Sequence, residues 1–183
     1  GPGGGLLRDL GSHIVDQMLV AFGPAVSVSG QVDHVSLDAG DTDASFALHL
    51  THESGTHSYI TATKTHHFTE REIRAYGTLG TYVANGTDVQ ARSVIEGTAP
   101  HNGPGWGIEP KAGWGRLHTS AGAETIPCLQ SRIQDLYTDF ARAVRGGGDG
   151  PVALAGALHT VAVLDAAREA ARDGRTVYLN KTH

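Results

Sequence analysis

The feature that most constrains this chain of 183 residues is an amphipathic helical pattern near its start. At about 100° per residue, Asp9, His13 and Asp16 fall within roughly 60° of one another on a helix. The opposite side carries apolar side chains at helical spacing, namely Leu10, Ile14, Val15, Met18, Leu19 and Phe22. The pattern therefore predicts a helix with one face that packs and another that carries ionisable groups.

The ionisable face holds side chains that suit proton transfer. Imidazole exchanges a proton near neutral pH, and a carboxylate beside it is a common partner in general acid–base catalysis. An equally good interpretation of the spacing alone is a helix whose Asp and His are merely solvated. The glycines at residues 3–5 fit a sharp turn or a close backbone approach, and we expect Ser12 or Asp9 to cap the first turn.

The rest of the chain predicts strands followed by helices. Strand patterns, which alternate with period two or flank turn glycines, lie at residues 26–32, 44–51, 57–65, 72–76 and 81–84. Their short connections favour antiparallel pairing, and helices are expected at 131–145 and 152–173. We therefore expect an α+β fold, a predominantly antiparallel open-faced sheet with helices packed on one side, in one domain over residues 1–183.

The uncovered face of this sheet is rich in Thr, Tyr and His rather than in charge. Such a face suits the wall of a substrate cleft or an interface between subunits, and a solvated face is the alternative. We expect a homo-oligomer that assembles through the open sheet face.

Residues 98–117 are rich in Gly and Pro and contain both tryptophans, which predicts an irregular loop. Trp106 is a candidate to lie over a substrate; alternatively, Trp106 and Trp114 anchor the loop to its own core. His66 and His67, at the end of a predicted strand, are further candidate substrate contacts.

Eleven histidines raise the question of a metal ion, above all at His49, His52 and His57. A structural zinc site usually needs four Cys or His ligands, and the single Cys128 lies far away in the sequence. We expect no metal site and interpret these histidines as polar or core residues.

Composition narrows the class of protein. A formal net charge of -5 argues against nucleic acid and anionic membranes as partners, and leaves small-molecule substrates. One cysteine excludes an internal disulfide, and no apolar stretch is long enough for a membrane span or a signal peptide. We expect a cytoplasmic protein.

Several segments together resemble one family. Residues 3–30, GGGLLRDLGSHIVDQMLVAFGPAVSVSG, resemble the start of the C-terminal domain of the Gfo/Idh/MocA oxidoreductases, the family of glucose-fructose oxidoreductase and inositol dehydrogenase. Residues 74–82 resemble its hairpin with a Gly-Thr-x-Gly turn, and residues 104–110, PGWGIEP, resemble a loop of one subgroup. Residues 161–177 resemble its closing helix and strand. The Asp-x-x-x-His element at Asp9 and His13 is the most specific part.

The resemblance implies an NAD(P)-dependent dehydrogenase whose Rossmann domain holds the dinucleotide while this domain, with a fold like the C-terminal domain of glyceraldehyde-3-phosphate dehydrogenase, supplies the substrate wall. It implies that His13 takes the proton of a substrate hydroxyl as hydride passes to the nicotinamide. Asp9 would orient the hydroxyl or the histidine, and Asp16 would lie close to the substrate.

The dinucleotide-binding half is not recognisable here. No Gly-x-Gly-x-x-Gly follows a predicted strand, so no residue of this chain is a candidate for binding NAD or NADP. The family's lysine, carried in a Glu-Lys-Pro segment, has no counterpart among Lys64, Lys111 and Lys181. We expect a substrate-binding and oligomerisation domain, inactive by itself, whose N-terminal Rossmann domain is absent from the chain.

The substrate implied by the resemblance is a sugar, a polyol or a related hydroxyl compound. The alternative is a catalytically silent binding or dimerisation module of the same fold. An Asp-His hydrolase is less well supported, because no Ser or Cys lies in a recognisable nucleophile motif.

Overall fold

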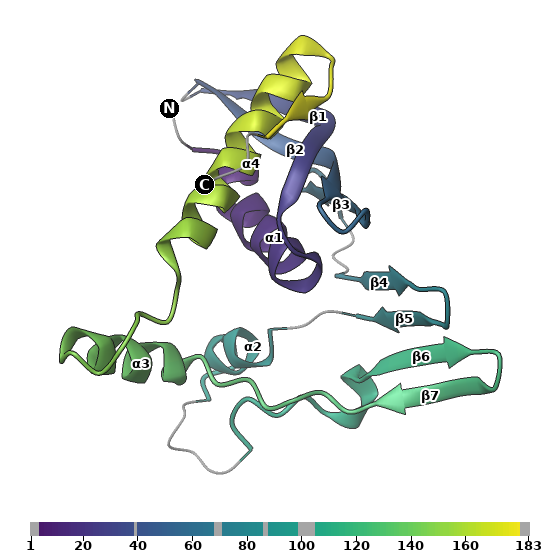
Figure 1. Cartoon of the computed structure of the whole chain (residues 1–183), viewed down its shortest axis with the longest axis vertical. Coiled ribbons are helices and arrows are strands. Elements are labelled where there is room, and N and C mark those ends of the chain that lie inside the picture. The colour runs from purple at the N-terminus through teal and green to yellow at the C-terminus, as the bar shows by residue number, and fades with distance from the viewer. Residues whose placement is uncertain (1–3, 39, 68–70, 86–87, 99–104, 180–183) are drawn as a thin grey trace. The chain divides into compact units, whose positions relative to one another are not determined.

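The computed structural model describes residues 4–38, 40–67, 71–85, 88–98 and 105–179, and the chain folds into two compact units (Figure 1). Unit 1 comprises residues 1–67 and 152–183, and unit 2 comprises residues 68–151. Each unit contains an antiparallel sheet together with helices, which confirms the predicted α+β fold class. The assignment of all 183 residues to one domain stays a prediction, because each unit is described by itself.

Unit 1 is a four-stranded sheet with two helices on one face. Its elements are α1 (Leu6–Phe22), β1 (Ala25–Leu37), β2 (Gly40–His52), β3 (His57–Thr63), α4 (Leu154–Asp173) and β8 (Val177–Tyr178). The strand order is β3-β2-β1-β8, and every pairing is antiparallel. Helices α1 and α4 contact each other and the sheet.

The core of unit 1 follows from the period-two alternation along β2. Phe46, Leu48 and Leu50 are buried against the helices, as the alternation predicts. The residues between them belong to the opposite, uncovered face. Helix α4 contributes the remaining large share of the core through Val163, Leu164, Ala166, Ala167 and Ala170.

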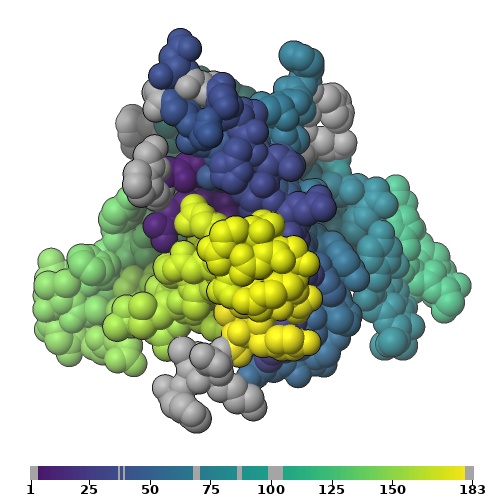
Figure 2. Space-filling model, turned by 90° about the horizontal axis from the view of Figure 1, so that it is seen from above, coloured from purple at the N-terminus to yellow at the C-terminus, as the bar shows by residue number. Residues whose placement is uncertain are grey.

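Helix α4 is buried along its later turns, while its outward side chains form part of the surface of unit 1, seen in yellow in Figure 2. Gly174 ends the helix with a φ of 63°, in the left-handed region that glycine adopts without strain. The predicted helix at 152–173 is therefore confirmed with a start two residues later. No helix in the described ranges has the length and apolar character needed to cross a bilayer.

The first turn of α1 is capped from the sheet. The backbone N–H of Leu7 donates to Asp43 Oδ2 of β2 at 2.6 Å, and Asp43 is buried. The Ser12 hydroxyl instead donates to the carbonyl oxygen of Asp9. The prediction that Ser12 or Asp9 caps this turn is therefore wrong, because a carboxylate 36 positions away accepts the free N–H.

Gly5 makes this approach possible. Its φ is 102°, which a residue with a side chain rarely adopts. A Cβ at Gly5 would also lie 1.6 Å from Asp43 Oδ1, so any side chain there would displace the capping carboxylate. The close backbone approach expected from the glycine run is thus present at Gly5.

Unit 2 is a second four-stranded sheet with two helices. Its elements are β4 (Ile73–Tyr76), β5 (Thr81–Ala84), α2 (Val89–Ile95), the 3-10 helix η2 (Lys111–Gly113), β6 (Gly115–Thr119), β7 (Gly122–Ile126) and α3 (Gln134–Val144). The strands pair in sequence order, all antiparallel. The predicted hairpin at 72–76 and 81–84 is confirmed as β4 and β5.

Sequence reasoning was less successful over the rest of unit 2. The predicted irregular segment 98–117 is wrong at its end, because residues 115–117 begin β6. Helix α2 and the β6–β7 hairpin were not predicted. Strand β7 is exposed over four of its five residues, so it has no buried face to produce an alternating pattern.

Helix α3 lies within the predicted range 131–145, but its apolar stripe does not pack. The stripe residues are all exposed in the structure: Ile133, Leu136, Tyr137, Phe140 and Val144. The helical spacing of apolar residues therefore predicted the helix correctly, but it did not predict that these residues would be exposed.

The cap of α1 can be tested by substitution. Asp43→Ala removes the acceptor for the Leu7 N–H and leaves a buried donor unpaired, so it should lower the free energy of unfolding by roughly 1 to 3 kcal/mol. Urea denaturation measures the change. Asp41→Ala is the matched control, since Asp41 lies on the same strand but is exposed and its carboxylate accepts a hydrogen bond from the exposed Ser36 hydroxyl. Equal effects of the two substitutions would contradict the assignment.

Candidate functional site

Helix α1 separates its side chains as predicted. Asp9 and His13 are exposed, whereas Leu7 and Val15 are completely buried, each at 0 % exposure. The predicted packing residues other than Val15 are half-buried at the edges of the core. The helix therefore has one packing face and one exposed ionisable stripe, while the catalytic role of that stripe stays a prediction.

The His13 ring makes no hydrogen bond or ion pair with any residue that the structure describes. Its two nitrogens are therefore open to water or to a ligand. Asp9, one turn earlier, is also exposed, so a carboxylate and an imidazole share the same solvent-facing stripe. This arrangement can hold a hydroxyl group and exchange its proton.

Asp16 has a different environment. Its Oδ1 accepts a hydrogen bond from the hydroxyl of Thr160 at 3.2 Å, and Thr160 is a buried residue of α4. This bond joins α1 to α4, which gives Asp16 a structural task. Its predicted place beside a substrate stays a prediction.

The structure adds Lys64 to the stripe, a residue that sequence reasoning did not place there. Lys64 Nζ lies 3.5 Å from Asp9 Oδ2. Its backbone N–H donates to the carbonyl oxygen of Ala44, so the β2–β3 ladder continues one residue past β3. Ser58 and Ile60 of β3 are buried, and Lys64 follows in the same alternating row. The row thus ends with an ammonium group beside the start of α1.

The pair of Lys64 and Asp9 contributes little to stability. The two side chains are 66 % and 70 % exposed, and exposed ion pairs are typically worth at most about 1 kcal/mol. Its consequence is chemical: a cation, a carboxylate and an imidazole lie on one surface of unit 1. No local pattern could have revealed it, because the two partners are 55 residues apart.

The other candidate substrate residues lie outside α1. His66 and His67 follow Lys64, are exposed, and make no hydrogen bond within the described part of the chain. Trp106 belongs to unit 2, where it is half-buried and its carbonyl oxygen accepts a hydrogen bond from Gln130. Roles for these three residues in binding a substrate stay predictions.

The second tryptophan anchors its own loop. Trp114 Nε1 donates to the carbonyl oxygen of Glu109 at 2.9 Å. A further bond runs from the backbone N–H of Ser131 to the carbonyl oxygen of Gly107. These bonds are what the anchoring interpretation of the loop predicts.

Of the three histidines around the first hairpin, His52 bonds within the core, and His49 and His57 lie on the open face of the sheet. His52 is buried, its Nδ1 donates to the carbonyl oxygen of Gly23, and its Nε2 accepts from the Ser58 hydroxyl. His49 Nε2 and His57 Nδ1 lie 2.9 Å apart on the open face. Over the described ranges, no three His, Cys, Asp or Glu side chains converge as metal ligands would.

The open face of the unit 1 sheet is uncharged around these histidines. Tyr59 is 77 % exposed, and its ring stacks on His49 with 4.7 Å between centroids. Aromatic groups that bury little area within their own chain are typical of surfaces that bind a partner. Assembly through this face stays a prediction.

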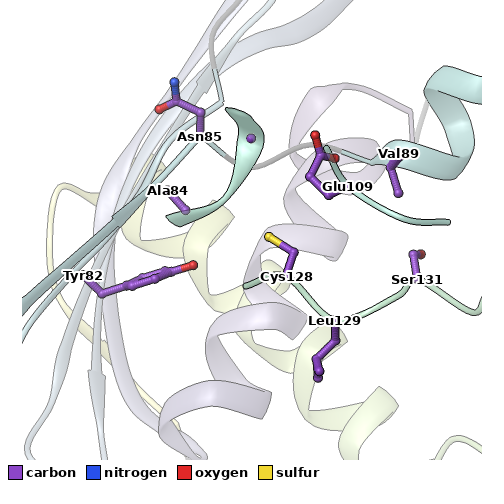
Figure 3. Close-up of a pocket in the computed structure, with 9 residues that line it drawn as sticks. Tyr82, Ala84, Asn85, Val89, Glu109, Cys128, Leu129 and Ser131 are labelled. Atoms are coloured by element: carbon purple, nitrogen blue, oxygen red, sulfur yellow. The ribbon is translucent and has the colours of Figure 1, made fainter. Parts of the chain in front are cut away.

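Unit 2 contains a recess with a cavity volume of about 240 Å³ (Figure 3). Its wall combines the end of β5, the start of α2 and the segments around Glu109 and Cys128. Sequence reasoning did not anticipate this recess, since the segments are joined only by the fold of unit 2.

Comparison with known proteins identifies the fold. Residues 1–83 match the family model described as the GFO/IDH/MocA C-terminal domain. The chain is 27% identical over 180 residues to scyllo-inositol 2-dehydrogenase (NADP(+)) IolW of Bacillus subtilis strain 168, an alignment covering 96% of this chain and 49% of that protein.

Solved structures of oxidoreductases have the same fold over nearly the whole of this chain. The chain superposes on the oxidoreductase yvaA of Bacillus subtilis with a TM-score of 0.86 at 26% identity, covering 98% of this chain and 54% of that one. It also superposes on an oxidoreductase of Klebsiella pneumoniae with a TM-score of 0.85 at 23% identity, covering 100% of this chain and 51% of that one, which shows the fold alone. The chain thus spans about half the length of these relatives. The chain is thus similar to the C-terminal domains of the GFO/IDH/MocA oxidoreductases, which is the resemblance that the sequence predicted.

Proposed function

We propose that this chain is the substrate-binding domain of an NAD(P)-dependent oxidoreductase that acts on a sugar, a polyol or a related hydroxyl compound. The observation that carries the proposal is the exposed stripe of α1, where the His13 ring has no partner among the described residues and Asp9 lies one turn away. The relative named scyllo-inositol 2-dehydrogenase (NADP(+)) supports a cyclic polyol as the substrate class and a nicotinamide dinucleotide as the cofactor.

The residues that the structure describes do not form a fold that cradles a dinucleotide. A Rossmann cradle needs parallel strands joined through a helix, with its glycine-rich turn between the first strand and that helix. All strand pairings described here are antiparallel. We therefore assign NAD or NADP to a nucleotide-binding domain outside this chain, where the cofactor would supply hydride acceptance.

The proposed task of this chain is to bind the substrate and to move its hydroxyl proton. A ring nitrogen of His13 accepts that proton, which leaves the substrate oxygen as a carbonyl when the carbon loses hydride. Asp9 accepts a hydrogen bond from the hydroxyl or from the His13 ring and so orients them. Lys64 holds the Asp9 carboxylate in place through the 3.5 Å contact.

A second candidate function rests on the open face of the sheet. The rings of Tyr59, His49 and His57 cluster there, with Tyr59 and His57 exposed, which suits a homo-oligomer interface. A catalytically silent binding or dimerisation module would keep this face without using His13.

We also propose that the protein is located in the cytoplasm.

Substitution of His13 separates the two candidates. In the full-length protein, His13→Ala should lower kcat with a polyol substrate at least about 100-fold, the usual scale for losing a general base. Its melting temperature should change little, because the side chain is exposed. Steady-state kinetics and calorimetry measure both quantities.

Two controls accompany this substitution. Gln17→Ala changes another exposed position of α1 and should alter neither quantity. Leu7→Ala, in the core, should lower the free energy of unfolding by roughly 2 to 5 kcal/mol. Full turnover in His13→Ala, with the parent enzyme active, would overturn His13 as the proton acceptor, whereas a parent protein with no turnover would favour the silent module.

Lys64 is tested as a positioning residue. Lys64→Met should lower kcat by on the order of tenfold with little change in KM, because a misoriented carboxylate affects the reacting geometry more than affinity. Lys64→Arg should restore most of kcat, since it keeps the cation beside Asp9.

The matched control for Lys64 is Arg8→Met. Arg8 also lies on α1 and reaches a carboxylate, Asp165 of α4, at 3.8 Å. Its removal should leave kcat unchanged. If Arg8→Met and Lys64→Met reduce kcat equally, a general loss of surface charge explains the effect and the positioning role is wrong.

A further inference from the structure

The recess of unit 2 is lined by the buried carboxylate of Glu109, which pairs with Arg92, a 40% exposed side chain outside the lining. Glu109 is 8% exposed, and Arg92 Nη2 donates to both of its carboxylate oxygens, at 3.1 and 3.2 Å. The two formal charges cancel, so the pair adds no net charge to the wall. The recess therefore favours an uncharged ligand over an anion or a cation.

Two glycines, Gly113 and Gly115, lie so close to polar side chains of the recess that a side chain at either position would clash with them. A Cβ at Gly113 would lie 2.3 Å from Glu109 Oε1, and a Cβ at Gly115 would lie 2.1 Å from the Tyr82 hydroxyl oxygen. Any other residue at either position would displace the polar group next to it. The backbone between them carries Trp114, which is itself bonded to Glu109, so this loop is shaped around the recess.

The recess also presents polar groups that the fold does not use. Tyr82, Asn85 and Ser131 line it, and their side chains make no hydrogen bond with any residue in the described ranges. Figure 3 shows the Tyr82 hydroxyl pointing toward the thiol of Cys128. Hydroxyl and amide groups both donate and accept, so they match a ligand whose own groups do the same.

The wall of the recess also contains apolar side chains. Val89 and Leu129 line the recess beside the polar groups. Neutral polyols and sugars combine C–H surfaces with several hydroxyls, each a donor and an acceptor. We propose that the recess of unit 2 binds a small, uncharged polyhydroxy compound through Tyr82, Asn85 and Ser131. This site is independent of the oxidoreductase proposal, since none of its residues belongs to unit 1.

The single cysteine of the sequence provides the probe. Cys128 lines the recess and is exposed, so its reaction with N-ethylmaleimide reports access to the site. Saturating sorbitol or myo-inositol should slow labelling of this chain about fivefold or more, because a ligand in such a recess covers the wall that it touches. Glycerol 3-phosphate should protect less, since it carries charge. Equal labelling rates with and without the neutral polyols would overturn the proposal.

Substitutions test whether the polyol protects Cys128 by binding in the recess. Tyr82→Phe keeps the ring and removes only the hydroxyl, so it should lose most of the protection, and Ser131→Ala provides a second test if Tyr82→Phe does not fold by circular dichroism. Glu124→Gln, on exposed β7, is the matched control and should keep full protection. His13→Ala should also keep it. Loss of protection in His13→Ala would place the polyol at α1 and overturn the recess as the site, whatever becomes of catalysis.

Discussion

The hydrogen bond from the Leu7 N–H to the buried Asp43 carboxylate is the interaction on which the proposed site depends. It joins the first turn of α1 to the middle strand pair of the sheet, at 2.6 Å. Asp9 follows within the same turn, and His13 follows one turn later, so the cap fixes where the ionisable stripe begins. Since the bond uses a charged acceptor in a buried place, its loss leaves an unpaired donor and loosens the end of the helix that carries the chemistry.

Local periodicity predicted the elements whose two sides differ in burial. The faces of α1 and the alternation of Phe46, Leu48 and Leu50 were readable because one side of each element packs. The β6–β7 hairpin was not readable, since strand β7 is exposed on both faces. Resemblance to a family supplied the fold class more completely than periodicity did, because it draws on the whole pattern of segments.

The candidate site was predictable only in part. Asp9 and His13 are four residues apart on one helix, so their shared face follows from helical geometry alone. Lys64 and Asp43 reach the same helix through strand pairings, with partners 55 and 36 positions away. Spacing along the chain carries no information about such pairings until the register of β2 and β3 is known.

The two polar sites are built by the same construction, a glycine that makes room for a polar side chain from elsewhere in the fold. Gly5 admits the Asp43 carboxylate to the start of α1, and Gly113 admits the Glu109 carboxylate to the wall of the recess. In both places a Cβ would lie within 2.5 Å of a carboxylate oxygen, so the glycine and the carboxylate depend on each other. A buried carboxylate is stable only with its donors in place, Leu7 N–H in one case and Arg92 in the other. The glycines are therefore part of the polar machinery, although they carry no functional group.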